Sequence, residues 1–167
     1  MTKSSTVTAR EQPVREWSEA AGTVKVYARA VTIETSERLQ LVDVTERIAE
    51  AVRESGVGEG LVNVWSMHTT CAVMINEYQA ALLADIGRVL QELVERDGGW
   101  RHNDPAYSDC DRCNADSHLR AMLLGHSLTL QVSGGEPVLG QWQRVLLAEL
   151  DGPRSRTLRI QVSGVGR

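Results

Sequence analysis

The stretch GLVNVWSMHTTCAVMINE, residues 60–77, decides the fold of this chain. Two runs rich in β-branched and aromatic residues, Leu61–Met67 and Cys71–Ile75, flank the polar junction His68-Thr69-Thr70. Residues of these types favour strands, and so short a break between two strands favours a hairpin or a sharp bend. We therefore predict two consecutive strands that are joined at this junction.

Both faces of the first predicted strand are largely apolar. One face carries Leu61, Asn63, Trp65 and Met67, and the other carries Val62, Val64, Ser66 and His68. We therefore expect this part of the sheet to be covered on both sides, with His68 at the polar end of a buried face. Buried polar groups need partners, because an unpaired one costs ~1–3 kcal/mol. A bound ligand or ion is one way to supply them to His68 and to Asn76-Glu77, which end the second strand.

The composition argues against several classes of protein. The chain has 167 residues, most simply one domain. Its net charge is −4, and the absence of a basic block or stripe argues against nucleic-acid binding. No apolar run approaches the ~20 residues of a transmembrane helix, and the N-terminus lacks the apolar segment of a secretory signal. The 3 cysteines fit a reducing cytoplasm better than a disulfide framework, so we expect a cytoplasmic protein that binds neither nucleic acid nor membrane.

Residues 1–22 differ in composition from the rest of the chain. Ser, Thr, Glu and Arg dominate this segment, Pro13 interrupts it, and only Val7, Val14 and Trp17 offer much apolar surface to bury. We predict a flexible N-terminal extension in which Trp17 docks locally. A single domain over residues 23–167 follows it.

The domain alternates between strand and helix patterns. Helical spacing of apolar residues predicts two substantial helices and one short one, over Leu41–Ser55, Gln79–Arg96 and Asn114–Leu124. Alternating patterns predict four further strands, over Thr23–Thr35, Leu128–Ser133, Trp142–Leu150 and Thr157–Val162. The last two are expected to form a hairpin around an Asp-Gly-Pro turn. We expect an α+β fold with a mixed, mostly antiparallel sheet of at least six strands, flanked by helices.

The short helix begins with residues suited to binding an anion. Asn114 and His118 are four residues apart, so they lie on one face near the helix N-terminus. That end carries unpaired N–H groups and partial positive charge. Asp116 has two open interpretations, a site residue whose side chain converges on His118 or a solvated ion pair with Arg120. For each histidine, a surface or simply hydrogen-bonded role is the alternative.

Cys110-x-x-Cys113 has the spacing of half a zinc site. Structural zinc sites need four ligands, and only one such cysteine pair exists, so His118 or another residue would have to complete it. The alternative is a pair of free thiols in an acidic loop. Cys71 lies within a strand pattern and is expected to be a small buried side chain.

Charged residues near the C-terminus fall on the same strand faces as apolar residues. Gln143 and Glu149 fall on the same strand face as two apolar residues, and Arg154 and Arg156 fall on the same face as three more. Charges aimed at an apolar face are costly unless they are paired. A buried pair between Glu149 and an arginine, or recognition of a phosphate by the arginines, would both account for the pattern.

Seven motifs occur in a characteristic order. They are His68-Thr69-Thr70, Asn76-Glu77, Trp100-Arg101-His102, Asn114-Ala115-Asp116-x-His118, Gly125, Gly140-x-Trp142-Gln143 and Glu149-x-Asp151-Gly152-Pro153-Arg154-x-Arg156. Together they resemble the YjbQ-like family, also called secondary thiamine-phosphate synthases, from about Thr23 to Val162. The resemblance implies a small α+β protein, a homotrimer and a polar pocket with room for a divalent metal, zinc or magnesium. It does not extend to residues 1–22 or to the Cys110–Cys113 loop.

The family name implies a condensation reaction. A pyrimidine diphosphate loses diphosphate as the nitrogen of a thiazole phosphate takes its place. The departing diphosphate needs positive charge, which the resemblance assigns to Arg101, Arg154, Arg156 and the helix that begins at Asn114. A weak thiamine-phosphate synthase is therefore the first hypothesis. A metal-dependent hydrolase of a phosphorylated metabolite and a non-catalytic trimeric ligand-binding protein are the alternatives.

The predicted site is a convergence of three histidines. His68, His102 and His118 would act as catalytic residues and would bind the metal with Asp116, because three imidazoles leave a fourth zinc position open. The phosphorylated substrate would contact Thr69, Asn76, Glu77, Arg101, Asn114, Gln143, Glu149, Arg154 and Arg156. Three unrelated histidines held by backbone carbonyls are the alternative.

Overall fold

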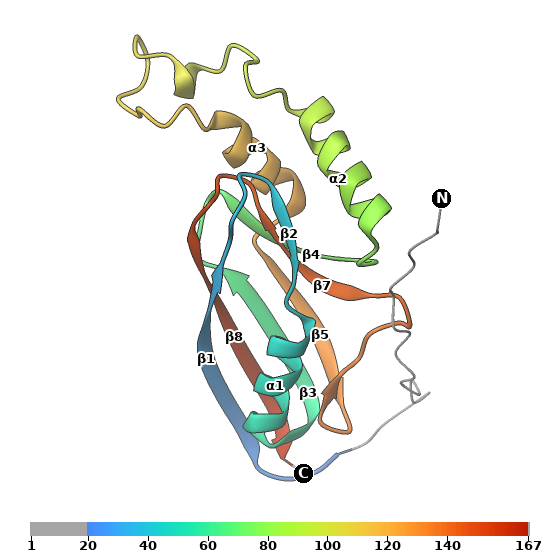
Figure 1. Cartoon of the computed structure of the whole chain (residues 1–167). Helices are drawn as coiled ribbons and strands as arrows, with labels where there is room; N and C mark the ends of the chain where they lie inside the picture. The colour runs from blue at the N-terminus through green and yellow to red at the C-terminus, as the bar shows by residue number, and fades with distance from the viewer. Residues whose placement is uncertain (1–19, 167) are drawn as a thin grey trace.

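The computed structural model describes residues 20–166, so Trp17 and almost all of the predicted N-terminal extension lie outside the described residues. The order of elements is β1 (Val24–Glu34), β2 (Gln40–Asp43), α1 (Thr45–Ser55), β3 (Val57–Ser66), β4 (Cys71–Asn76), α2 (Ala80–Leu93), the 3₁₀ turn η1 (Arg101–Asn103), α3 (Ala115–Leu124), β5 (Ser127–Ser133), β6 (Glu136–Pro137), β7 (Arg144–Glu149) and β8 (Ser155–Gly166). The α+β class is confirmed (Figure 1). Within residues 20–166, no helix has both the length and the apolar character needed to cross a bilayer.

The strands form two sheets, and the prediction of one mixed sheet is wrong. A five-stranded sheet has the order β1-β8-β3-β5-β6, and a three-stranded sheet has the order β2-β7-β4. Every strand pair among the described residues is antiparallel. Of the two forms expected for the junction after β3, the sharp bend is correct and the hairpin is wrong, because β3 pairs with β5 and β8 whereas β4 pairs with β7. The bend at residues 67–70 carries the chain from one sheet to the other.

The C-terminal hairpin is wrong for the same reason. β7 belongs to the three-stranded sheet and β8 to the five-stranded sheet, so residues 150–154 cross back between the sheets. The two crossings lie side by side, since Cys71 pairs with Glu149 and the Arg156 side chain reaches Thr70. β4 and β7 are apolar on both faces, and this favours the sheet that is covered on both sides.

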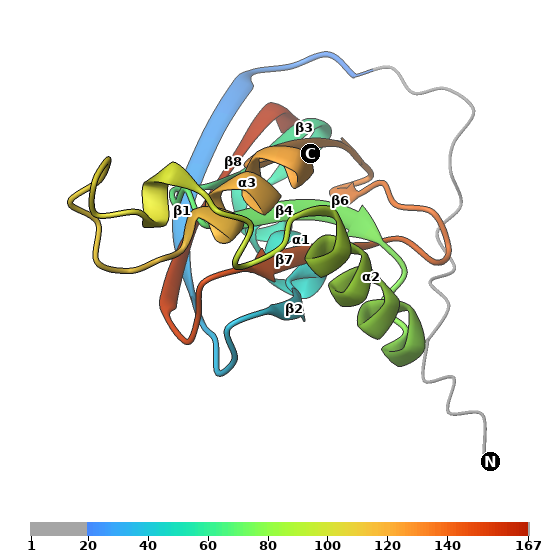
Figure 2. The same cartoon turned by 90° about the horizontal axis from the view of Figure 1, so that it is seen from above.

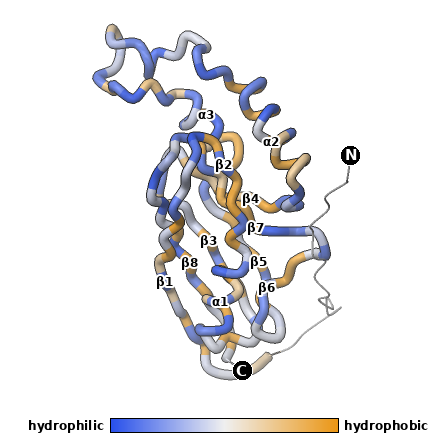
Figure 3. The backbone as a smooth tube through the Cα atoms, viewed as in Figure 1, coloured by the Kyte–Doolittle hydropathy of each residue, from blue (hydrophilic) through white to orange (hydrophobic). Residues whose placement is uncertain are grey.

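Two hydrophobic cores cover the two faces of the three-stranded sheet. The first fills the space between the sheets and α1, with fully buried side chains that include Ile48, Val64, Leu147, Leu158 and Ile160. The second packs α2 and α3 on the other face, around Leu41, Ala72, Leu90, Ala121, Ala148 and Leu150. Figure 2, seen from above, shows α2 and α3 over this layer, and Figure 3 shows hydrophobic residues gathered along β4 and β7.

One face of the five-stranded sheet is left uncovered by residues 20–166. Leu61 and Trp65 on β3 and Met67 just after it are 49%, 58% and 60% exposed, whereas Val62 and Val64 on the other face are buried. The expectation that both faces of this strand are covered is therefore wrong within the described residues. Mixed polar and apolar residues on the neighbouring strands continue this surface, so it remains available for a partner.

The helix ends differ from the predicted ends for local reasons. Residues 40–43 form β2, so the first helix begins only at Thr45, whose N–H donates to Asp43 Oδ1 (2.9 Å). It ends at Gly56, which has the left-handed φ of 65° that favours glycine. α2 ends at Leu93 instead of Arg96. α3 follows its predicted range, but the Asn114 side chain makes no cap bond there.

Candidate functional site

The two sheet crossings and the N-terminus of α3 enclose an open pocket of about 550 Å³, which we call the histidine–arginine pocket. Three segments line it: the bend after β3, the crossing between β7 and β8, and the loop that leads into α3. The lining residues are Met67, His68, Thr69, Thr70, His102, Cys110, Arg112, Asn114, His118, Asp151, Arg154, Ser155 and Arg156. The polar junction at the centre of the fold-deciding stretch therefore forms one wall.

A buried carboxylate lies beneath the lining of this pocket, bonded to the lining residue Arg156. Glu149 is fully buried at the end of β7. Its Oε1 accepts hydrogen bonds from the backbone N–H groups of Leu150 (2.9 Å) and Asp151 (2.8 Å), and its Oε2 accepts one from Thr35 Oγ1 (2.9 Å). These three bonds satisfy a charge whose burial would otherwise be costly.

The Arg156 guanidinium completes this arrangement. Its Nε donates to Glu149 Oε2 at 2.6 Å, and its Nη2 donates to Glu149 Oε1. The same Nη2 lies 3.2 Å from the backbone oxygen and 3.1 Å from the hydroxyl of Thr70. The expected buried pair between Glu149 and an arginine is therefore confirmed, and it also fixes the bend that carries His68.

The ion pair changes the titration of both groups. Burial alone would raise the pKa of Glu149, but hydrogen bonds from Arg156 and the Asp151 N–H outweigh it and hold this pKa below its ordinary value of 4.5. Burial would lower the pKa of Arg156, but the hydrogen bond to Glu149 reverses this, and that pKa is raised. Both groups are therefore charged in the folded protein at neutral pH.

Asp151 connects the pocket wall to two further segments. Its Oδ2 accepts from Asn114 Nδ2 and from Arg154 Nη2, both at 2.9 Å. Its Oδ1 accepts from Arg38 Nη1 at 3.2 Å. Burial alone would raise the pKa of Asp151, but the bonds from Asn114 and Arg154 outweigh it and lower that pKa. Asn114 thus positions α3 by bonding Asp151 instead of capping the helix.

All three predicted histidines line the same pocket. The rings of His102 and His118 meet edge to face, with their centroids 5.0 Å apart. Burial and the neighbouring His102 lower the pKa of His118 below 6.5. Burial and the charge of Arg156 likewise lower the pKa of His68. His68 Nε2 accepts the backbone N–H of Thr157 (2.8 Å), so this nitrogen carries no proton.

The predicted metal ligands do not form one cluster. Within residues 20–166, no group of three or more His, Cys, Asp or Glu side chains is arranged to hold a metal ion. His68 Nε2 is engaged by Thr157, and Asp116 lies outside the histidine–arginine pocket. The donor set of the described residues therefore does not fit a zinc site made by three histidines.

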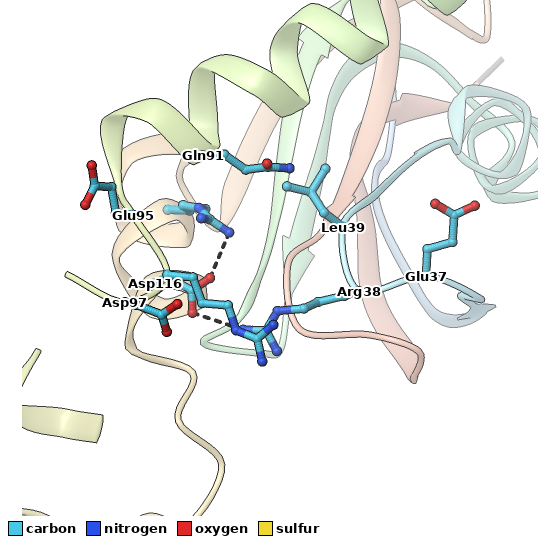
Figure 4. Close-up of a pocket in the computed structure, with 9 residues that line it drawn as sticks. Glu37, Arg38, Leu39, Gln91, Glu95, Asp97 and Asp116 are labelled. Atoms are coloured by element: carbon cyan, nitrogen blue, oxygen red, sulfur yellow. Dashed lines mark hydrogen bonds and ion pairs between the residues drawn. The ribbon is translucent and has the colours of Figure 1, made fainter. Parts of the chain in front are cut away.

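Asp116 belongs to a second cavity of about 630 Å³ between α2, α3 and the β1–β2 loop (Figure 4). It is fully buried between Arg120 Nη1 (2.8 Å) and Arg38 Nη2 (3.0 Å). The expected pair with Arg120 is correct, but it is buried and not solvated. Because Arg38 also bonds Asp151, one guanidinium lies between the two cavities.

Five predicted substrate contacts do not line the pocket: Asn76, Glu77, Arg101, Gln143 and the buried Glu149. Arg101 lies over the Tyr107 ring, with Cζ 5.2 Å from its centroid. Asn76, Glu77 and Gln143 lie at the far end of the three-stranded sheet, where Asn76 pairs with Arg144. β4 has 6 residues, and at ~3.4 Å per residue its length separates this end from Thr70.

The sequence reasoning assigned no role to two arginines of this site. Arg112 lines the pocket, and the long aperiodic loop that contains it was the only signal for it. Arg38 lies in the turn before β2, and no pattern distinguishes it from other surface arginines. Its role depends on Asp116 and Asp151, which are distant in sequence.

Comparisons with known proteins agree with this fold. The family model described as UPF0047 protein YjbQ-like matches residues 29–165. A UPF0047 protein of Methanothermobacter thermautotrophicus is 43% identical over 141 residues, covering 84% of this chain and 94% of the relative. The crystal structure of a YbjQ-like protein of unknown function from Sulfolobus solfataricus has a TM-score of 0.79 at 34% identity, covering 85% of this chain and 99% of that chain. An uncharacterized YjbQ/UPF0047 protein from Clostridium acetobutylicum has a TM-score of 0.73 at 30% identity, covering 80% and 98%.

The buried ion pair leads to a prediction for Glu149→Gln. The substitution leaves Arg156 charged and buried without its counter-ion, and we expect a loss of roughly 3–5 kcal/mol of unfolding free energy at pH 7 in urea. The pKa of Glu149 is lower in the folded protein than its ordinary value of 4.5. The stabilisation from this carboxylate is therefore complete above pH 4.5 and is lost as the pH falls through the pKa of the folded state. The deficit of the variant should therefore shrink on acidification.

Glu54→Gln is the matched control. Glu54 also accepts hydrogen bonds from two side chains, Tyr27 and Arg29, but on the surface. We expect a much smaller effect there, because solvent screens exposed pairs. Equal stability of Glu149→Gln and the unsubstituted protein would show that the pair does not hold the two crossings together.

Proposed function

Since the chain belongs to the UPF0047 protein YjbQ-like family, we propose that its histidine–arginine pocket binds a phosphorylated small molecule through a diphosphate group. We propose further that the protein is an enzyme with weak thiamine-phosphate synthase activity. The observation that carries the proposal is the gathering of three histidines and three arginines around one pocket.

The charge of the lining supports an anionic ligand. Arg112, Arg154 and Arg156 face the pocket, and Asp151 is the only carboxylate among its lining residues. Glu149 beneath the lining neutralises Arg156, and Asp151 is shared by Arg154 and Arg38. The Arg112 guanidinium has no ion pair within the part of the chain that the structure describes. A net positive charge therefore remains for a ligand, even with neutral histidines.

The condensation would use these groups in two ways. The C–O bond between the pyrimidine methylene and the diphosphate breaks, and the thiazole nitrogen forms a new C–N bond at that carbon. Arg112 and Arg154 would stabilise the negative charge of the departing diphosphate. A protonated His118 would donate its proton to a diphosphate oxygen, and magnesium that arrives with the diphosphate would add further positive charge.

The alternatives differ in what supports them. A metal-dependent hydrolase needs a metal held by the protein, and the described residues supply no cluster of three ligands for it. A non-catalytic ligand-binding protein would use the same pocket charges without turnover. The assay below separates it from the enzyme.

We expect the chain to form thiamine phosphate slowly from the two precursors with Mg²⁺, and to bind inorganic diphosphate in calorimetry. His118→Gln should lower turnover by about 10²- to 10⁴-fold, because proton transfer is lost. Arg112→Gln should weaken diphosphate binding about tenfold, the effect of one charge-assisted hydrogen bond.

Gln143→Ala is the control, because Gln143 lies outside the pocket and its side-chain Oε1 accepts the Gly140 N–H (2.7 Å). It should leave both measurements unchanged. Diphosphate binding without product above the His118→Gln level would favour the ligand-binding role. The absence of binding would contradict the proposed pocket.

The lowered pKa of His118 gives a pH dependence. In the free protein His118 is neutral at pH 7, because its pKa lies below 6.5. A bound anion favours the imidazolium, so anion binding takes up a proton and strengthens as the pH falls. Sulfate is a suitable probe, because histidine titrates between about pH 5 and 8 and the charge of sulfate does not change over that range.

We expect sulfate affinity to rise between pH 7.5 and about pH 5.5 in titrations of the unsubstituted protein. His118→Gln should flatten this profile. Equal profiles for the two proteins would remove His118 from the anion site.

The bare sheet face supports the proposal of a homotrimer. Leu61, Trp65 and Met67 are exposed together, and Met67 also lines the pocket. A second copy on this face would bury these side chains and lie against the pocket rim, and the number three comes from the family resemblance.

Light scattering should give three times the chain mass of 18.4 kDa. Trp65→Glu should lower that mass, and a monomer at micromolar concentration would refute the trimer.

A further inference from the structure

Cys110 and Cys113 lie on one tight turn at the edge of the histidine–arginine pocket. Asp111 and Arg112 form the turn between them. Cys110 lines the pocket together with Arg112, whereas Cys113 is exposed. Both thiols are free. The pair is therefore accessible from solvent at one end and adjoins the pocket at the other.

The turn brings the two cysteines within disulfide range. The first and fourth residues of a β-turn have Cα atoms less than ~7 Å apart. Disulfides join Cα atoms that are ~4.4–6.8 Å apart. A bond between these thiols thus needs only a local adjustment of residues 110–113.

Each sulfur contacts a residue that anchors α3. Cys110 Sγ lies 4.0 Å from Asn114 Oδ1, and Asn114 Nδ2 donates to Asp151. Cys113 Sγ lies 4.0 Å from the backbone oxygen of Asn103, whose side chain accepts the Ala115 N–H. Drawing the sulfurs together would change both contacts.

We propose that Cys110 and Cys113 form a reversible regulatory disulfide, and that its formation weakens anion binding in the pocket. The second clause rests on the proposed function. Arg112 lies inside the ring that the disulfide would close, so closing the ring would shift the backbone that carries its guanidinium in the pocket lining. The regulation acts through Arg112 and through the asparagines that hold the start of α3.

A small-molecule disulfide such as oxidised glutathione is the oxidant. The Cys113 thiolate attacks one sulfur of glutathione disulfide, and one glutathione leaves as a thiolate. The Cys110 thiolate then attacks the Cys113 sulfur of the mixed disulfide and releases the second glutathione. The protein loses two protons and two electrons, and one glutathione disulfide becomes two glutathiones.

Cys71 provides an internal reference. It is fully buried in β4, and burial raises the pKa of its thiol to about 11. The thiolate is the reactive form, so Cys71 should stay unmodified in the folded protein. Loss of reactive thiols under native conditions therefore reports on the loop alone.

The first measurement is the formation of the bond. After incubation with oxidised glutathione, native alkylation and peptide mass spectrometry should find residues 110 and 113 joined in the unsubstituted protein. Cys113→Ser should instead keep an alkylatable thiol or a mixed disulfide at Cys110. Dithiothreitol should restore both thiols. Absence of the 110–113 bond would overturn the proposal.

The second measurement is its effect on the pocket. Calorimetry with inorganic diphosphate should show about tenfold weaker binding after oxidation, with recovery on reduction. The proton NMR signals of His102 and His118 should move on oxidation of the unsubstituted protein. The same signals should not move in the Cys113→Ser variant. That variant is incubated with oxidised glutathione in the same way, and dithiothreitol then removes any bound glutathione before the spectrum is recorded.

The two measurements separate the failure of this proposal from that of the proposed function. If the reduced protein binds no diphosphate, the proposed anion pocket fails, and the histidine signals alone decide whether the disulfide acts on this region. If the bond forms but neither the affinity nor the histidine signals change, the regulatory role is overturned.

Discussion

The ion pair between Glu149 and Arg156 is the constraint on which the site depends. Glu149 ends a strand of the three-stranded sheet, and Arg156 begins a strand of the five-stranded sheet. Thr35 and Thr70 bond the same pair from two other crossings between the sheets. A buried ion pair stabilises a fold only when its remaining hydrogen-bonding groups are satisfied, and the residues that satisfy this one are those that shape the pocket. The same bonds therefore fix the two sheets relative to each other and position the bend that carries His68.

Much of the local structure was predictable because it depends on short-range patterns. The alternation of side chains predicted the positions of the strands, and the helical spacing after Asn114 predicted α3. Glu149 and Arg156 each fall on a strand face with apolar residues, and this predicted a buried pair, because charges on a core face need partners. The motif order led to the pocket lined by His68, His102 and His118.

Pairing across the chain was not predictable from the same patterns. Short breaks after β3 and β7 look like hairpin turns, but each connects two sheets, since burial on both faces is decided by tertiary packing. Asp116 looked like a ligand beside His118, yet Arg38, which is 78 residues away, turns it into part of an ion-pair cluster in the second cavity. The motifs that contain Asn76 and Gln143 occur in the same order as those of the pocket residues, but strand length places them at the opposite end of the sheet.

The position of β8 has a consequence for synthesis of the chain. This strand lies between β1 and β3 in the five-stranded sheet, with β1 on one side and β3 on the other. Until residues 155–166 have left the ribosome, β1 has no neighbour in that sheet and the first core has no complete wall. Contacts that join such distant segments also slow folding. The nascent chain must therefore keep its valine-rich strands from associating with other chains until residues 155–166 have emerged, because only β8 joins β1 to β3.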